Sequence, residues 1–248
     1  GGVGDSVGVL YGVNTAGAVI GTALCGFYLL PEYGLWQTTV YTGVANLILG
    51  GLAIALDYWA QSRTEGPIPV VDDLDPEIVH HPDLKGVAWG IGLAGAASLI
   101  YEIAWTRLLV LLLGASVYAF SVMLLAFLVG IAFGGVVGGG IADRALKRFG
   151  PAGVYRSLVR VEIGVALLSF GMMYLFGDLP YWYVWLFDAF GVQDGSSSVW
   201  IVSILIAGLV MTPPAILMGI AFPLAVRAVV TKREALGGPV GAVYAANT

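Results

Sequence analysis

The chain has 248 residues, of which 58% are hydrophobic and only 11% are charged, and its formal net charge is −5. Soluble globular domains carry about 25% charged residues, so this composition excludes an ordinary soluble domain and predicts an integral membrane protein. The acidic balance leaves no basic surface for nucleic acid, and we expect no nucleic-acid partner.

Six apolar stretches are long enough to cross a bilayer, which takes roughly 20 residues in a helix. Backbone polar groups in lipid must find their hydrogen bonds within the segment, so we expect helices. The stretches lie near residues 7–30, 35–56, 87–110, 115–141, 154–177 and 199–228. The sequence therefore predicts an all-α polytopic membrane protein with six transmembrane helices.

One polar segment separates the second predicted helix from the third. Residues 57–86 hold four prolines and seven of the 16 acidic residues, and thirty residues are too few to bury a core. We therefore predict three parts: a transmembrane hairpin at 1–58, an aqueous linker at 59–86 and a four-helix transmembrane segment at 87–248.

Nearly all the basic residues fall on one side of the membrane when the six predicted helices are followed in order. The positive-inside rule places that side in the cytoplasm. We thus expect a plasma (inner) membrane protein whose linker 59–86 is cytoplasmic. On the other side, the aromatic-rich residues 180–190 are expected to lie at the lipid headgroups. The basic residues on the cytoplasmic side are Arg63, Lys85, Arg144, Lys147, Arg148, Arg156, Arg160, Arg227, Lys232 and Arg233.

A nine-residue word occurs twice. VGVLYGVNT at residues 7–15 returns as VGAVYAANT at residues 240–248, with five of nine positions identical. The repeat predicts a duplicated architecture of two six-helix halves, the plan of the major facilitator fold. In this frame residues 1–58 end the first half and residues 87–248 begin the second. The alternative is a chance resemblance between two segments rich in Gly and Ala.

The segment GGIADRALKR at residues 139–148 resembles the major facilitator signature in the loop between the second and third helices of a half. Leu146 stands where that signature usually has glycine. We expect the Asp143 carboxylate to bridge cations of neighbouring helices and to lock the cytoplasmic face. The alternative is a plain positive-inside loop, which accounts for the cations but not for the acid. The predicted charge cluster comprises Asp143, Arg144, Arg148, Arg156, Arg160 and Glu162.

Three stretches, residues 7–31, 98–135 and 212–228, resemble the membrane portion of fused major-facilitator/spermidine-synthase-like proteins. Their most specific words are YExxWTR, which begins at Tyr101, and MGxxFPLxxR, which begins at Met218. In that family the membrane helices often precede a soluble aminopropyltransferase-like domain that binds an adenosyl cofactor. No such domain occurs in this chain, so the resemblance implies a fold and a setting, without enzymatic activity or a cofactor.

Glycines recur at four-residue spacing in the fourth predicted helix. Gly130, Gly134 and Gly138 share one helix face, a pattern that predicts close packing against another helix. A dinucleotide-binding loop is the alternative, but such a loop follows a strand, whereas this run ends a transmembrane helix. His80 and His81 lie in the linker without cysteines nearby or a helical i, i+4 pair, so we expect no metal site.

Glu102 is the principal candidate for chemistry. It lies about 22 Å into the third predicted helix, where an ionisable side chain is costly and often functional. We expect it to bind a cation or a proton in a central cavity. Its alternative role is an interhelical hydrogen bond that only holds helices together. The substrate-binding residues predicted with it are Tyr101, Trp105 and Tyr118.

These features favour a major-facilitator-like membrane module that handles or transports a small cationic, polyamine-like substrate. The cationic substrate follows from the family resemblance. The alternative is a non-transporting structural or accessory subunit of a larger membrane complex. The expected partners are the lipid bilayer and either other membrane subunits or the missing helices of a longer parent protein. Asn14 and Asn46 are expected to bridge helices through their side-chain amides.

Overall fold

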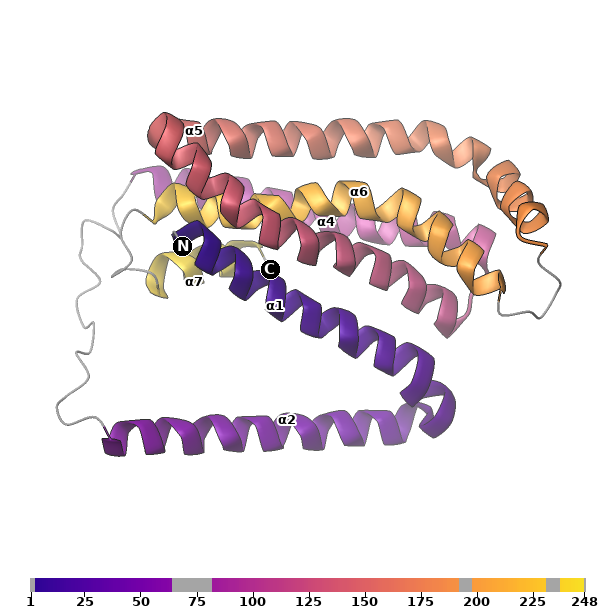
Figure 1. The fold of residues 1–248 in the computed structure, drawn as a ribbon, viewed down its shortest axis with the longest axis horizontal. Helices are drawn as coiled ribbons and strands as arrows, with labels where there is room; N and C mark the ends of the chain where they lie inside the picture. Colours follow the sequence, from indigo (N-terminus) through magenta and orange to yellow (C-terminus); the bar gives the residue numbers. More distant parts are fainter. Residues whose placement is uncertain (1–2, 64–81, 192–197, 231–236, 248) are drawn as a thin grey trace.

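The computed structural model describes residues 3–63, 82–191, 198–230 and 237–247, and these form helices without any strand (Figure 1). This confirms the expected all-α architecture. In chain order the helices are α1 (Val3–Leu24), the π-helical η1 (Cys25–Leu29), α2 (Leu30–Arg63), α4 (Pro82–Leu113), α5 (Val117–Ala189), α6 (Ser198–Val229) and α7 (Gly237–Asn247).

Four helical stretches in the described residues are long and apolar enough to cross a membrane, as expected of a membrane-embedded protein. Two of them, residues 4–60 and 117–189, have 57 and 73 residues. They greatly exceed the roughly 20 residues that one crossing needs. Both change direction at a glycine in the left-handed region, Gly34 with φ 71° and Gly150 with φ 66°, a conformation that side chains other than glycine rarely adopt.

The turn at Gly150 divides α5 into two arms. Residues 117–149 and 151–189 run in opposite directions from this turn, as Figure 1 shows. The signature segment at 139–148, expected as a loop, is instead part of the first arm. Its residues are mainly Ala, Leu, Lys and Arg, which favour helix, so the helix continues until the glycine turn.

The core lies between the first arm of α5 and α6. A Cβ atom added to Gly130 would lie 2.6 Å from the Cβ of Ala215, and one added to Gly138 would lie 2.8 Å from the Cα of Ile220. Because these glycines have no side chain, the two helix backbones can approach closely. Residues 220–226 of α6 are buried throughout.

A neighbouring face of the same arm packs against α1. A Cβ atom on Gly8 would lie 2.7 Å from the carbonyl oxygen of Gly135, so this contact also depends on glycine. The first arm of α5 is thus packed between α1 and α6, and it is the central helix of the described part.

α2 stands apart from the other helices (Figure 1). From residue 31 to residue 60 every side chain except that of Thr38 is exposed, although the helix is rich in Leu, Ile and Val. A helix that is apolar on all sides needs lipid or other helices around it. The predicted linker at 59–86 overlaps the end of α2 and the start of α4, and its residues 64–81, including both histidines, lie outside the described residues.

The second arm of α5 continues beyond the predicted span at 154–177 and includes the aromatic-rich residues 180–190. Pro180 lies inside the helix, and beyond it the end of α5 bends away from the arm (Figure 1). Tyr183 and Phe187 pack against the core, whereas Tyr181 and Trp185 are exposed. This final segment therefore presents one aromatic face outward.

Candidate functional site

Asp143 joins three helices at one end of the described bundle. Its Oδ1 accepts hydrogen bonds from the backbone N–H of Gly4 at 3.1 Å and from Nε of Arg227 at 3.1 Å. Its Oδ2 accepts a hydrogen bond from the backbone N–H of Asp5 at 3.0 Å. The first N–H groups of a helix lack partners within the helix, so a carboxylate at this position satisfies them and complements the helix dipole.

The cation on Asp143 comes from α6 and not from the predicted charge cluster. The Asp143 and Arg227 side chains are only 7% and 11% exposed. The four arginines of the predicted cluster, Arg144, Arg148, Arg156 and Arg160, are exposed. The MGxxFPLxxR word contained Arg227, but sequence spacing alone did not connect it to an acid 84 residues earlier.

A cavity of about 290 Å³, which we call the five-helix cavity, lies among α1, α4, α5, α6 and α7. Polar side chains from α1, α4 and α7 and apolar side chains from α4, α5 and α6 share its wall. The lining residues are Tyr11, Asn14, Thr15, Ala18, Gly95, Ser98, Leu99, Phe127, Leu128, Ile131, Met218, Tyr244 and Asn247. None of them is charged, so the wall offers hydrogen-bonding groups and aromatic rings in place of charges.

A second cavity of about 340 Å³ shares Tyr11, Asn14 and Tyr244 with the first and also contacts Val7 and Val240, one turn earlier on each helix. Aromatic rings lie at the border of the two cavities. Tyr11 stacks on Phe222 with centroids 4.5 Å apart. Phe222 meets Tyr244 edge-on, with centroids 6.1 Å apart. We call Tyr11, Phe222 and Tyr244 the aromatic trio.

The repeated words therefore meet in space. Tyr11 and Asn14 of the first word and Tyr244 and Asn247 of the second all line the five-helix cavity. The repeat is visible in the sequence, which predicts only a helix-bridging role for Asn14 and no particular role for Asn247. The shared Tyr-x-x-Asn spacing was the available signal for both pairs.

Glu102 is half-buried on α4 and lines none of the cavities described here. Ser98 and Leu99, four and three residues before it, do line the five-helix cavity. Residues with these spacings share a helix face, so Glu102 lies one turn beyond the cavity wall.

The aromatic residues predicted around Glu102 divide into two groups. Tyr101 and Trp105 stack with ring centroids 5.2 Å apart, and Trp105 is buried in the core. Tyr118 lies instead against Trp200, at 4.9 Å between centroids, and faces Phe27 at 6.0 Å. Tyr118 thus belongs to an aromatic group contributed by η1, α5 and α6.

Glu162 lies in a third cavity, of about 440 Å³, between the start of α4 and the second arm of α5. Apolar residues form most of this wall, including Val87 and Ile91 from α4. Glu162 and Asp143 therefore line different parts of the molecule, and Glu162 is no member of the Asp143 junction.

Comparison of the chain with protein-family models, curated proteins and solved structures gave no match.

Proposed function

We propose that this chain is a major-facilitator-like membrane module that handles or transports a small cationic, polyamine-like substrate. The five-helix cavity carries this proposal, because it brings both repeated words and three other helices around one space with polar and aromatic walls. Its volume of about 290 Å³ suits a small molecule.

The proposal includes six membrane crossings. A helix of 73 residues would measure about 110 Å, several times the roughly 30 Å of a bilayer core. The turns at Gly34 and Gly150 convert two long helical stretches into four arms, each long enough to cross once. With α4 and α6, these arms make six crossings.

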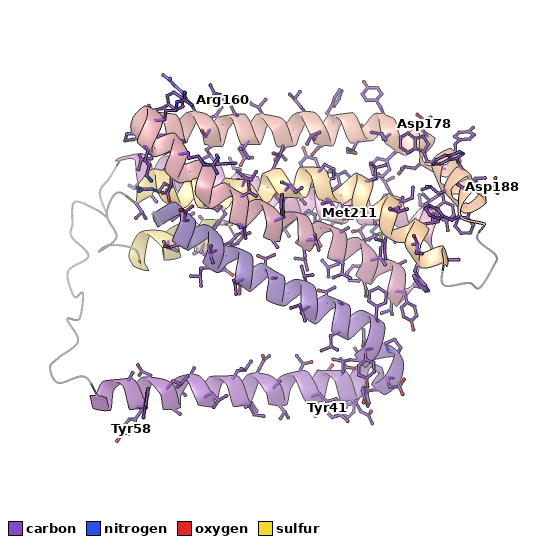
Figure 2. All side chains as sticks on the ribbon, in the orientation of Figure 1. Tyr41, Tyr58, Arg160, Asp178, Asp188 and Met211 are labelled. Carbon is purple, nitrogen blue, oxygen red and sulfur yellow. The ribbon has the colours of Figure 1, made fainter. Side chains whose placement is uncertain are left out.

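Charge sets the proposed orientation. Arg160 lies at one end of the molecule, whereas Asp178 and Asp188 lie at the opposite end (Figure 2). The basic residues of the signature segment are close to the Gly150 turn, at the same end as Arg160. By the positive-inside rule, we propose that this end is cytoplasmic.

A cationic substrate agrees with the chemistry around the cavity. Asn side chains offer amide oxygens as acceptors, and tyrosine rings attract ammonium groups through their faces. The charge that would balance such a ligand comes from Glu102, one helical turn beyond Ser98 on the same face of α4.

A transport assay tests the proposal. We expect the chain in liposomes to take up 1,4-diaminobutane, and Glu102→Gln to reduce uptake at least tenfold. The matched control is Glu32→Gln, since Glu32 is exposed near the turn between α1 and α2. Equal uptake by the Glu102→Gln variant and the unmodified chain would contradict the role of Glu102.

The second candidate function is a non-transporting accessory subunit, and the exposed α2 favours it. Large apolar side chains on α2 include Trp36, at 80% exposure, and Leu47, at 78%. Such a helix can pack against another membrane subunit. If the chain binds and transports no amine but co-purifies with a stoichiometric membrane protein through α2, the accessory function is correct.

A further inference from the structure

We infer that the five-helix cavity contains two like half-sites, one from each repeated word, which together take a linear molecule carrying a hydrogen-bond donor at each end. This inference rests on the proposed function, because it describes how the same cavity selects its ligand. It adds the residues that hold each end and the reason why the two ends must be alike.

Each half-site is a Tyr-x-x-Asn pair on one helix. Tyr11 and Asn14 on α1 are three residues apart, and so are Tyr244 and Asn247 on α7. Residues at this spacing are neighbours on a helix surface. All four line the five-helix cavity, so both pairs place the same two residue types around the same space.

Close backbone contacts hold both words in place. The first word packs on α5, where a Cβ atom on Gly8 would lie 2.7 Å from the carbonyl oxygen of Gly135. The second word packs on α4, where a Cβ atom on Gly92 would lie 3.0 Å from the carbonyl oxygen of Ala246. Each pair is therefore positioned by its helix backbone before any ligand arrives, which lowers the free-energy cost of binding.

One side chain links the two tyrosines. Phe222 of α6 stacks on the ring of Tyr11 and meets the ring of Tyr244 at its edge. Both rings thus rest on a single buried phenylalanine, which is 4% exposed. This common support fixes the separation of the two half-sites.

The amide groups are available to a ligand. In the described part of the chain, the side-chain amides of Asn14 and Asn247 have no hydrogen-bond partner, whereas the hydroxyls of Thr15 and Ser98 donate to the backbone of their own helices. An Asn carbonyl oxygen accepts a hydrogen bond from an ammonium or hydroxyl group. The rest of the wall includes apolar residues such as Ile131 and Met218, which suit a hydrocarbon chain between the two ends.

The test compares a two-ended ligand with a one-ended one, 1,4-diaminobutane with 1-aminobutane, by measuring Kd on the full chain in lipid nanodiscs. We expect Asn14→Ala and Asn247→Ala each to weaken diamine binding about tenfold, since each removes one hydrogen bond to a charged group. Either change should weaken monoamine binding no more than about twofold, because a single end can use the other half-site.

The matched control is Asn46→Ala on the exposed helix α2, which we expect to change neither Kd. Asn14→Asp and Asn247→Asp test whether a loss of binding in the alanine variants comes from misfolding. Each adds a carboxylate to one half-site and should tighten diamine binding, and a variant that gains affinity is folded.

The outcomes separate this inference from the function on which it rests. Failure of the unmodified chain to bind either amine overturns the proposed function, and the inference with it. Three other outcomes would overturn the two half-sites while leaving the proposed amine-handling function intact. These are equal affinity of the unmodified chain for both amines, weaker diamine binding in only one of the two Asn→Ala variants, and no gain in diamine affinity in either Asn→Asp variant.

Discussion

Oδ1 of Asp143 lies 3.1 Å from Nε of Arg227 across the α5–α6 interface, and the same oxygen accepts a hydrogen bond from the backbone N–H of Gly4. One acidic side chain therefore holds the beginning of α1, the first arm of α5 and the end of α6. Because both charged side chains are nearly buried, neither can replace its partner by water without rearrangement.

The first prediction concerns this junction. Asp143→Ala should lower the free energy of unfolding by about 3 kcal/mol, because it leaves the buried Arg227 charge and two backbone N–H groups without their acceptor. Thermal unfolding in detergent measures the change. Asp178→Ala is the control, since Asp178 is exposed at the opposite end. An unchanged unfolding temperature for Asp143→Ala would show that the junction does not stabilise the fold.

A second prediction concerns the glycine face between α5 and α6. Gly138→Leu should destabilise the protein by at least about 2 kcal/mol, because the new side chain would meet the backbone of Ile220. Gly171→Leu on the second arm is the matched control, since no atom lies within 4 Å of a Cβ atom there. Chemical denaturation in mixed micelles measures both variants, and equal stability of the two would contradict the close packing.

A third prediction addresses membrane orientation. In a Cys25→Ser background, Lys147→Cys should react with an impermeant thiol reagent only from the cytoplasmic side, and Asp188→Cys only from the other side. The second arm of α5, which begins after Gly150 and ends at Ala189, lies between the two sites and is long enough for one crossing, so Lys147 and Asp188 are expected at opposite interfaces. Labelling of intact cells and of inverted vesicles measures this. Reaction of both cysteines from the same side would overturn the six-crossing topology.

The fourth prediction concerns the aromatic trio. Phe222→Ala should lower the free energy of unfolding by about 3 kcal/mol, because it removes the ring that supports Tyr11 and Tyr244. It should also weaken amine binding, since the separation of the two half-sites is lost. Phe133→Ala, at a ring that is 57% exposed, is the control for both measurements. Unaltered amine affinity in a folded Phe222→Ala variant would show that the trio does not organise the site.

Local sequence properties determined the type of structure. Long apolar runs predict helices because lipid offers no hydrogen bonds to the backbone, and the helices found here follow those runs. The four-residue spacing of Gly130, Gly134 and Gly138 likewise sets them on one face, since spacing alone decides where a residue lies on a helix. Helix ends were less predictable, because the residues before Gly150 favour helix and the arm continues until the Gly150–Pro151 pair, where the glycine has a positive φ and the proline lacks an N–H group.

Which helix meets which face was decided by the tertiary structure alone. The sequence contained Asp143 and Arg227, but a contact across 84 residues depends on how α5 and α6 pack. In the same way, the sequence shows the two repeated words, but it does not show that they lie close together around Phe222. That proximity depends on the packing of α1 and α7 against different neighbours. Periodicity specifies a face within one helix, and it carries no information on the partner that covers that face, because any sufficiently small and apolar surface can do so.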